Sequence, residues 1–418
     1  MSQADAVMMA PTAGPSSAPT QKSDIGTALL SNLRNYIMII MLAIIVLIFT
    51  IWSKGLFLSP YNITNLINQT TVIAVMTGGM TLIIIIRQID LSVGFLSGFL
   101  GAITGLMIMK ANVPWPLTIL LVLIFGAAIG LVLGLLVGKV GVPAFVVTLG
   151  MMIVAHGLMI LALRKTNTLV INKDGFTNLY NGFIPALGHI PLGENLGQLC
   201  ISTVVICLIG IAAFIFMQIS GRRRQQRYHF AVTPLVVFVV QTAIVSVFIA
   251  ALGFQLARDH GISWALVILG VVVAIMSTVQ SRTRFGRYVY GVGGNPEASE
   301  LSGVSVAMIM IICFVIMEVL TALSGILYAA RMKSAAPTAG TGFELLVIAG
   351  CFIGGCSPYG GVGRVVGSLV GALIMQSLVN GMLLMTLDSS IQYIVQGTIL
   401  VVAVLFDILS RKATASVS

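Results

Sequence analysis

The sequence predicts an all-α integral membrane protein with about twelve apolar segments. Of the 418 residues, 58% are hydrophobic and only 8% are charged, and the mean hydropathy is +1.07. Soluble domains carry about 25% charged residues. A spanning helix needs about 20 apolar residues, so twelve such helices take about 240 residues. The apolar runs are continuous and lack the alternation that a membrane β-barrel requires, so the spans are expected to be helical.

The chain divides into three parts. Residues 1–33 are rich in Ala, Ser, Thr and Pro and are predicted to form a disordered cytoplasmic tail. Residues 34–410 contain every apolar run and form one transmembrane domain, and residues 411–418 form a cytoplasmic C-terminal tail. The first run starts too late for a signal peptide and is followed by no small-residue cleavage site.

Twelve runs are apolar enough to enter the hydrocarbon core. They are 36–52, 70–86, 91–109, 117–137, 143–163, 199–217, 231–252, 262–279, 305–327, 345–353, 365–384 and 391–409. The run 345–353 is too short to span, and we expect a half-helix or a re-entrant segment that is buried in protein.

Basic residues in the short loops predict the orientation. With the N-terminus inside, the cytoplasmic loops receive Arg222, Arg223, Arg224 and Arg227, then Arg282, Arg284 and Arg287, and finally Arg411 and Lys412. This is a positive-inside pattern, so the net charge of +10 reflects membrane topology and predicts no nucleic-acid partner. An Arg at a helix centre costs about 2.5–3.5 kcal/mol, so we expect the triplet 222–224 to lie in a loop.

The two halves of the chain show a weak internal repeat. Residues 89–109 resemble 355–375, and residues 142–158 resemble 390–405. Both members of the first pair have a polar break followed by a glycine-rich helix. Repeated halves with broken helices are typical of transporters, in which the breaks line the pathway; chance similarity between apolar runs is the alternative. The candidate break or gate residues are Asp90, Ser92, Gly94, Gly361 and Gly363.

Glycines recur at four-residue spacing in two of the runs. They are Gly126, Gly130, Gly134 and Gly138, and then Gly363, Gly367 and Gly371. Such stripes let helix backbones approach closely. Tight packing without a ligand role is the favoured interpretation.

Two carboxyl groups lie within the apolar region. Asp90 is a candidate functional carboxylate, although an N-cap of the following helix is favoured, and Arg87 is its candidate ion-pair partner. Glu318 is expected either to couple protons or to face a water-filled cavity. The five cysteines have no metal-ligand spacing, so no metal site is predicted. Phosphate-loop, zinc-protease and nucleophile-elbow motifs are missing, so neither catalytic residues nor an enzymatic activity is predicted.

Residues 281–304 form a polar cytoplasmic loop between two apolar runs. A short helix is expected after Asn295, because Asn is a good N-cap, Pro296 suits the first helical position and Glu297 adds negative charge to the first turn. Gly303 should end this helix. A helix of one or two turns is unstable alone, so we expect it to dock in the groove of a partner.

Several motifs resemble those of one family. They are Phe57-Leu58-Ser59 with Asn62 and Asn65, Ile89-Asp90-Leu91-Ser92-Val93-Gly94, residues 142–149 (VPAFVVTL), residues 293–298 (GGNPEA), residues 336–340 (APTAG) and residues 360–363 (GGVG). Over residues 56–407 the chain resembles the permease subunits of bacterial monosaccharide ABC importers of the ribose, xylose and galactose type. The loop is similar to the importers' E-A-A-x-x-x-G coupling signature, which implies ATPase-coupling roles for Gly294, Asn295, Glu297, Ala298, Ser299 and Gly303.

The resemblance implies a permease subunit that provides the translocation path for a monosaccharide. Its implied partners are a second permease copy, a cytoplasmic sugar ABC ATPase that binds the ATP, and a periplasmic or secreted sugar-binding protein. No cofactor is expected to bind directly to the permease. The implied location is the bilayer of the bacterial inner membrane, with both termini cytoplasmic. An extra pair of spans, 231–279, is similar to the xylose or multiple-monosaccharide branch and favours xylose or a related aldose.

A neutral sugar calls for hydroxyl and amide groups along the path. The candidates are Thr148, Gln376, Asn380, Gln392 and Gln396, for which interhelical hydrogen bonding is the favoured alternative. The chain departs from the family pattern at Arg87-Gln88, at Leu346 and at Cys356-Ser357-Pro358-Tyr359, so the sugar stays open. The rival hypothesis is a proton-coupled secondary transporter that uses Asp90 or Glu318.

Overall fold

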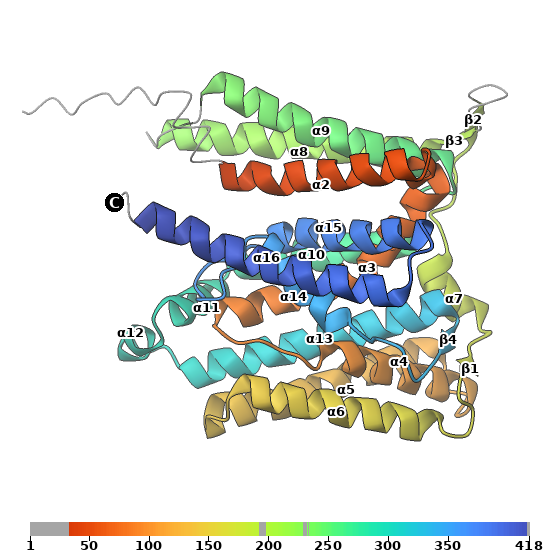
Figure 1. The fold of residues 1–418 in the computed structure, drawn as a ribbon, viewed down its shortest axis with the longest axis vertical. Coiled ribbons are helices and arrows are strands. Elements are labelled where there is room, and N and C mark those ends of the chain that lie inside the picture. The colour runs from red at the N-terminus through yellow and green to blue at the C-terminus, as the bar shows by residue number, and fades with distance from the viewer. Residues whose placement is uncertain (1–32, 192–197, 229–231, 233, 416–418) are drawn as a thin grey trace, which may run out of the picture.

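The computed structural model describes residues 33–191, 198–228, 232 and 234–415 (Figure 1). The predicted tail 1–32 and residues 416–418 lie outside the described residues. Eight described helices are long and apolar enough to cross a membrane, and four shorter helices are apolar. Each corresponds to one of the twelve predicted runs, so the all-α membrane class is confirmed.

Helices account for almost all of the described elements. The first half contains α2 (Leu33–Trp52), η1 (Leu56–Leu58), α3 (Pro60–Ile85), α4 (Val93–Met109), α5 (Trp115–Leu135), η2 (Leu136–Val140), α6 (Ala144–Leu163), β1 (Leu169–Val170), α7 (Asp174–Asn181), β2 (His189–Pro191), β3 (Gln198–Cys200) and α8 (Ile201–Arg227). The second half contains α9 (Leu235–Arg258), α10 (Trp264–Arg282), α11 (Arg284–Gly294), α12 (Pro296–Leu301), α13 (Val306–Met332), β4 (Ser334–Ala335), α14 (Phe343–Ile353), α15 (Val365–Leu384) and α16 (Ser389–Ala415). The helix α16 therefore continues into the segment predicted as a tail.

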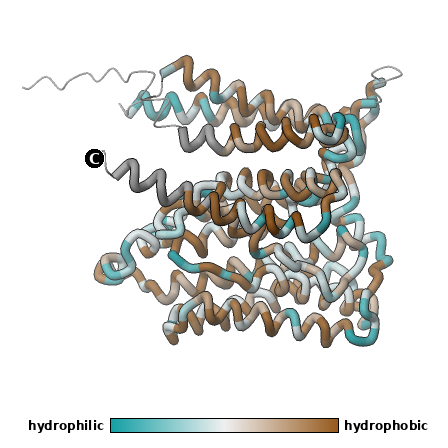
Figure 2. The backbone as a smooth tube through the Cα atoms, in the orientation of Figure 1, coloured by the Kyte–Doolittle hydropathy of each residue, from teal (hydrophilic) through white to brown (hydrophobic). Residues whose placement is uncertain are grey.

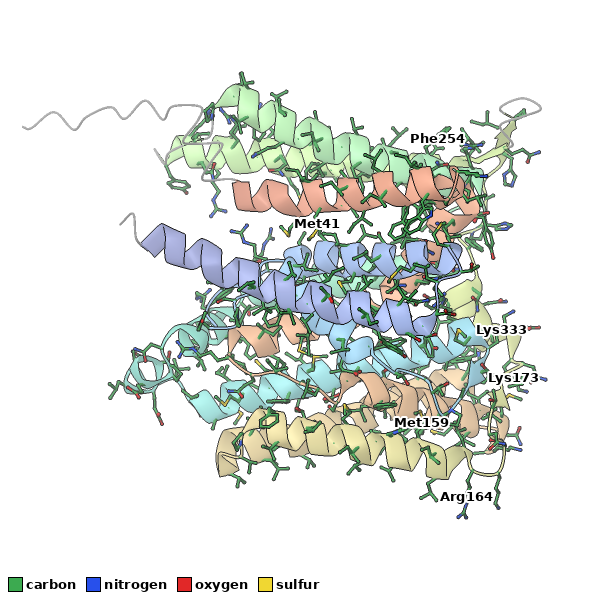
Figure 3. All side chains as sticks on the ribbon, viewed as in Figure 1. Met41, Met159, Arg164, Lys173, Phe254 and Lys333 are labelled. Carbon is green, nitrogen blue, oxygen red and sulfur yellow. The ribbon has the colours of Figure 1, made fainter. Side chains whose placement is uncertain are left out.

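The long helices run roughly side by side, with the connecting segments at two opposite ends (Figure 1). One end carries α11, α12 and the C-terminal end of α16, and the opposite end carries α7 and the strands. There β1 pairs antiparallel with β4, and β2 with β3. Hydrophilic residues gather toward the two ends (Figure 2), and Arg164, Lys173 and Lys333 lie at the end with the strands (Figure 3).

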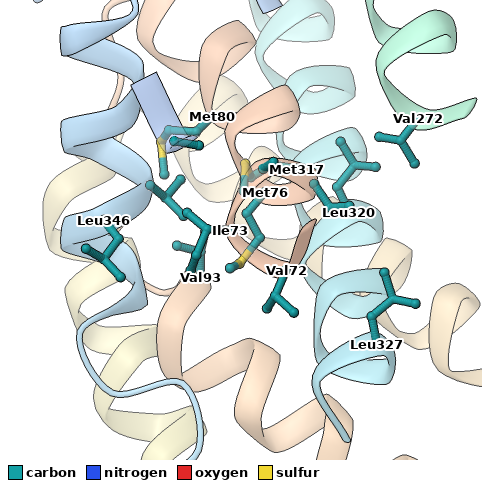
Figure 4. Packing of buried hydrophobic residues seen from close by; sticks show 14 of the residues in the cluster. Val72, Ile73, Met76, Met80, Val93, Val272, Met317, Leu320, Leu327 and Leu346 are labelled. Carbon is teal, nitrogen blue, oxygen red and sulfur yellow. The ribbon is translucent and has the colours of Figure 1, made fainter. Parts of the chain in front are cut away.

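The core is built around α13 and α3. The helix α13 packs against α5, α4 and α3, and α3 packs in turn against α15, α10 and α14. Met76 and Met80 of α3 lie beside Met317 and Leu320 of α13 (Figure 4), and all four side chains are buried. Burial of these flexible side chains fills the space between the helices.

Glycines allow α5 to approach α13. A Cβ atom at Gly130 would lie 2.6 Å from the carbonyl oxygen of Phe314, and one at Gly134 would lie 2.7 Å from the Cα atom of Ile311. In the other stripe, Gly367 and Gly371 lie against the backbone of α14. The packing interpretation of both stripes is confirmed, because no side chain fits between these backbones.

Two further predicted boundaries were wrong. The helix α3 begins at Pro60 and not at residue 70, because Ser59 caps it, with Oγ 3.4 Å from the backbone N of Asn62, and Pro60 takes the first helical position. The polar residues of its first turns are largely buried between helices. The triplet 222–224 extends α8 instead of forming a loop, since Arg is a good helix former and the end of this helix is exposed.

The extra pair of spans was predicted at 231–279. In the structure α9 packs mainly against α8 and also contacts α3, and α10 packs against α3, while α9 and α10 do not pair closely with each other. The segment is therefore not a single packed hairpin, and its status as an addition to the family pattern stays a prediction.

Candidate functional site

The first break joins α3 to α4 and carries a fully buried Asp90. Its Oδ1 atom accepts hydrogen bonds from the backbone N–H and the hydroxyl of Ser92, at 2.8 and 2.6 Å. The helix α4 starts at Val93 with Ser92 as the N-cap, so Asp90 forms an Asx turn before the helix and is not its N-cap. Arg87 does not pair with it either, because its guanidinium donates to the carbonyls of Gly293 and Gly294.

Glu318 of α13 faces this break. It is fully buried, and its Oε1 atom lies 3.3 Å from the hydroxyl of Ser92, which therefore bridges the two carboxyl groups. Their second oxygens have no hydrogen-bond partner in the part of the chain that the structure describes. The Ser92 hydroxyl therefore lies within hydrogen-bond distance of both carboxyl groups.

The second break, residues 354–364, lies against the end of the first. The backbone N–H of Gly361 donates to the carbonyl of Ile85 at 2.9 Å. The carbonyl of Gly363 accepts hydrogen bonds from the hydroxyl of Tyr290 at 2.6 Å and from the amide of Gln280 at 3.4 Å. The candidate gate residues Gly361 and Gly363 thus lie where the second break meets α3 and α11.

Gly94 occupies a different place, at the start of α4. Its Cα lies so close to the carbonyl of Gly340 that a Cβ atom would be 2.7 Å from that oxygen, and it would overlap the carboxylate of Glu344. The five predicted break residues therefore form two groups. Asp90, Ser92 and Gly94 lie in the first break and at the start of α4, whereas Gly361 and Gly363 lie in the second break.

The polar loop folds into two helices, α11 and α12. The Oδ1 atom of Asn295 accepts from the backbone N–H of Ala298 at 3.0 Å, Pro296 is the first residue of α12, and Gly303 has a φ of +83°. The predicted cap, start and stop are confirmed. All six residues of α12 are described and none is buried, so α12 presents a free surface at this end.

Sequence reasoning missed two features of this loop. The eleven-residue helix α11 precedes α12, and Leu301 at the end of α12 is 91% exposed. A cap signal was available, because Thr283 accepts from the backbone N–H of Gly286 and apolar residues follow at helical spacing. An apolar Leu in an otherwise polar helix was the signal for the second feature.

The five candidate pathway residues do not converge on one point. Gln376 and Asn380 both lie on α15 and bond to α3: Gln376 donates to Gln69 at 2.9 Å, and Asn380 exchanges two hydrogen bonds with Asn62, at 2.9 and 3.1 Å. These bonds join helices, as the favoured alternative expects. Contact with sugar stays a prediction for all five.

The other three pathway candidates lie elsewhere. The Thr148 hydroxyl on α6 lies 3.5 Å from the carbonyl of Ile89 in the first break. Gln392 donates to the carbonyl of Leu387 at 2.9 Å, just before α16, and Gln396 is buried on the same helix.

The Asn62–Asn380 pair predicts a measurable coupling between α3 and α15. We expect Asn380→Ala to destabilise the purified protein by about 1–2 kcal/mol, because it leaves a buried amide short of a partner. Thermal melting of Asn62→Ala, of Asn380→Ala and of the double variant measures the coupling. The double variant should lose less stability than the sum of the two single losses. Thr398→Ala is the control, since its hydroxyl bonds only within α16. Unchanged melting with an altered KM for uptake would instead assign Asn380 to sugar binding.

The comparisons identify relatives across most of the chain. A family model described as the permease component of the branched-chain amino acid transport system matches residues 62–404. The xylose transport system permease protein XylH of Haemophilus influenzae is 34% identical over 381 residues, which cover 91% of this chain and 98% of the relative. XylH of Escherichia coli strain K12 is 32% identical, with 91% and 93% covered.

A second kind of relative matches almost as well. The ribose import permease protein RbsC of Escherichia coli strain K12 is 34% identical over 351 residues, which cover 84% of this chain and 87% of the relative. No solved structure matches the chain.

Proposed function

The chain belongs to the family of permease components typified by the branched-chain amino acid transport system, and we propose that it forms the translocation path of an ATP-driven monosaccharide importer. One observation carries the proposal beyond the family. The exposed helix α12 follows α11 after the single residue Asn295, and α11 bonds to both breaks between the transmembrane helices. A partner that pushes on α12 therefore acts on the breaks.

We propose three partners for this chain. A cytoplasmic ABC ATPase binds α12 and holds the ATP, and the coupling residues are Gly294, Asn295, Glu297, Ala298, Ser299 and Gly303. A sugar-binding protein docks at the opposite end, near α7 and the strands, and a second copy of the chain completes the path. The protein is a multi-pass protein of the bacterial inner membrane, and its α12 end faces the cytoplasm with both termini.

The proposed cargo is xylose or a related aldose. Two of the relatives named above are xylose permeases and one is a ribose permease, and each covers more than four fifths of the chain. The candidate pathway groups are hydroxyls and amides, which suit a neutral polyol. No charged group is required for such a cargo.

Reconstitution tests the proposal. The permease, its ATPase and its sugar-binding protein are placed in liposomes, and uptake of radiolabelled xylose, ribose and galactose is measured with and without ATP. We expect uptake only with ATP and all three components. Transport by the permease alone, without a nucleotide-hydrolysing partner, would contradict the proposal.

The buried Asp90–Ser92–Glu318 chain favours a second candidate, a proton-coupled transporter. The two functions predict opposite results for Glu318→Gln, which keeps the shape and removes the titratable proton. We expect this variant to retain ATP-driven uptake within about threefold of wild type, because Gln keeps a side-chain oxygen that accepts from the Ser92 hydroxyl. A proton-coupled transporter would lose uptake driven by a pH gradient in the same variant, so uptake under a pH gradient without ATP is measured in parallel.

A further inference from the structure

Arg87 connects the first break to the end of α11. It follows the last turn of α3 in a left-handed conformation, with a φ of +63°. Its Nε atom donates to the carbonyl of Gly293 at 2.7 Å, and its Nη2 atom donates to the carbonyl of Gly294. One guanidinium thus holds two successive carbonyls. The two bonds come from two nitrogens of one rigid plane, whereas a lysine has a single ammonium nitrogen on a flexible stem.

The two carbonyls need such a partner. They lie in the last turn of α11, where the carbonyl groups of a helix have no donor within it, and Pro296 just beyond has no N–H to offer. The C-terminal end of a helix also carries partial negative charge, which favours a cation. Arg87 therefore caps α11 although it lies 206 residues before Gly293 in the chain.

The backbones at this junction touch directly. A Cβ atom added at Gly293 would overlap the carbonyl oxygen of Ile85 and lie 2.8 Å from the backbone N of Gly361. Gly360 in turn lies against the Cγ atom of Arg87. The end of α3, the end of α11 and the second break therefore meet without intervening side chains, and Arg87 is the charged group among them.

Tyr290, about one turn before Gly293 and Gly294 on the same helix, holds α11 to the second break. Its hydroxyl donates to the carbonyl of Gly363, and burial raises the pKa of Tyr290, although Arg364 partly opposes this shift. The phenol therefore stays protonated and donates at neutral pH. Because Arg87 and Tyr290 bind α11 to different breaks, a tilt of α11 moves both breaks together.

We propose that Arg87 is the positioning residue that transmits movement of α11 and α12 to the Asp90 break, three residues farther along the chain. The inference rests on the proposed function, since it assigns the route by which ATP hydrolysis on a partner reaches the transmembrane helices. Arg87 touches neither ATP nor sugar in this scheme. Its role is to keep the first break attached to the coupling helices while they move.

The test compares Arg87→Lys and Arg87→Ala with wild type in the reconstituted complex with ATPase and sugar-binding protein. We expect ATP hydrolysis to continue while sugar transported per ATP falls about tenfold in Arg87→Ala, the factor that corresponds to about 1.4 kcal/mol. The ratio of sugar to ATP in Arg87→Lys should lie between those of wild type and Arg87→Ala, because Lys keeps the charge and loses the planar pair of guanidinium donors. Lys139→Ala, which changes an exposed cation at the end of η2, is the control and should keep the wild-type ratio.

Hydrogen exchange of residues 290–303 in the same variants provides a readout that needs no transport. We expect faster exchange in Arg87→Ala, because α11 loses its cap. Unchanged exchange and an unchanged ratio of sugar to ATP in both variants would overturn the proposal. Faster exchange with an unchanged ratio would also overturn it, since Arg87 would then be a structural cap only. If wild type shows no ATP-driven uptake while exchange still responds to Arg87, the proposed function fails and the contact stands.

Discussion

Gly293→Ala should abolish ATP-driven uptake and loosen the junction between α11 and the two breaks. An added Cβ would overlap the carbonyl oxygen of Ile85 and lie 2.8 Å from the backbone N of Gly361. Both neighbours are backbone atoms held by their own hydrogen bond, so neither can turn away as a flexible side chain would. Overpacking of this kind costs about 1–3 kcal/mol or more, and here it acts at the contact that positions α11.

Two other glycines separate this effect from a general response to Ala. Gly270 of α10 has no described atom within 4 Å of an added Cβ, so Gly270→Ala should keep wild-type uptake and melting temperature. Gly294 also has open space in the described part of the chain, so Gly294→Ala should keep the melting temperature, and any loss of uptake there would come from contact with a partner. Uptake in Gly293→Ala equal to that of Gly270→Ala would show that the close contact is not needed.

Gly130→Leu should prevent α5 from packing on α13 and should give the largest loss of folded protein. A Cβ at this position already lies 2.6 Å from the carbonyl oxygen of Phe314 and 2.7 Å from the Cα atom of Val315, and Leu adds three more carbon atoms. Gly130→Ala should cost about 1–3 kcal/mol, and Leu should exceed that range. The intrinsic gain of about 0.5–1 kcal/mol for replacing Gly in a helix is too small to offset it.

The yield of monodisperse protein in detergent and its melting temperature measure this effect. Gly150→Leu on α6 is the matched control, because no described atom lies within 4 Å of its added Cβ and the residue is exposed. We expect the control to match wild type. Similar yields for Gly130→Leu and Gly150→Leu would refute the claim that the glycine stripe sets the distance between α5 and α13.

Features that depend on neighbours in the chain were predictable. The apolar runs appear as helices because a bilayer leaves backbone groups no partner except one another. The cap at Asn295 and the stop at Gly303 follow from side-chain and backbone preferences over a few residues. The start of α3 was missed because polar residues such as Asn62 resemble a loop until their partners on another helix are known.

Contacts between distant segments were not predictable from local pattern. Glu318 and Ser92 are 226 positions apart, yet their side chains meet beside Asp90. Arg87 was assigned the nearest carboxylate, whereas it binds carbonyls at the end of α11. The sequence contains no signal for this choice, since every residue has a backbone carbonyl and the amino-acid type does not show whether that carbonyl is paired.

The amino-acid sequence by itself determined the membrane class, the apolar spans, the glycine stripes and the short capped helix α12, because each depends on hydropathy or on preferences that act within a few residues. Only the tertiary structure decided which partners the buried polar groups find and where the coupling helices meet the breaks. The reason is physical: in an apolar interior every polar group needs a partner, but which partner lies within hydrogen-bond distance depends on how helices remote in the chain pack together.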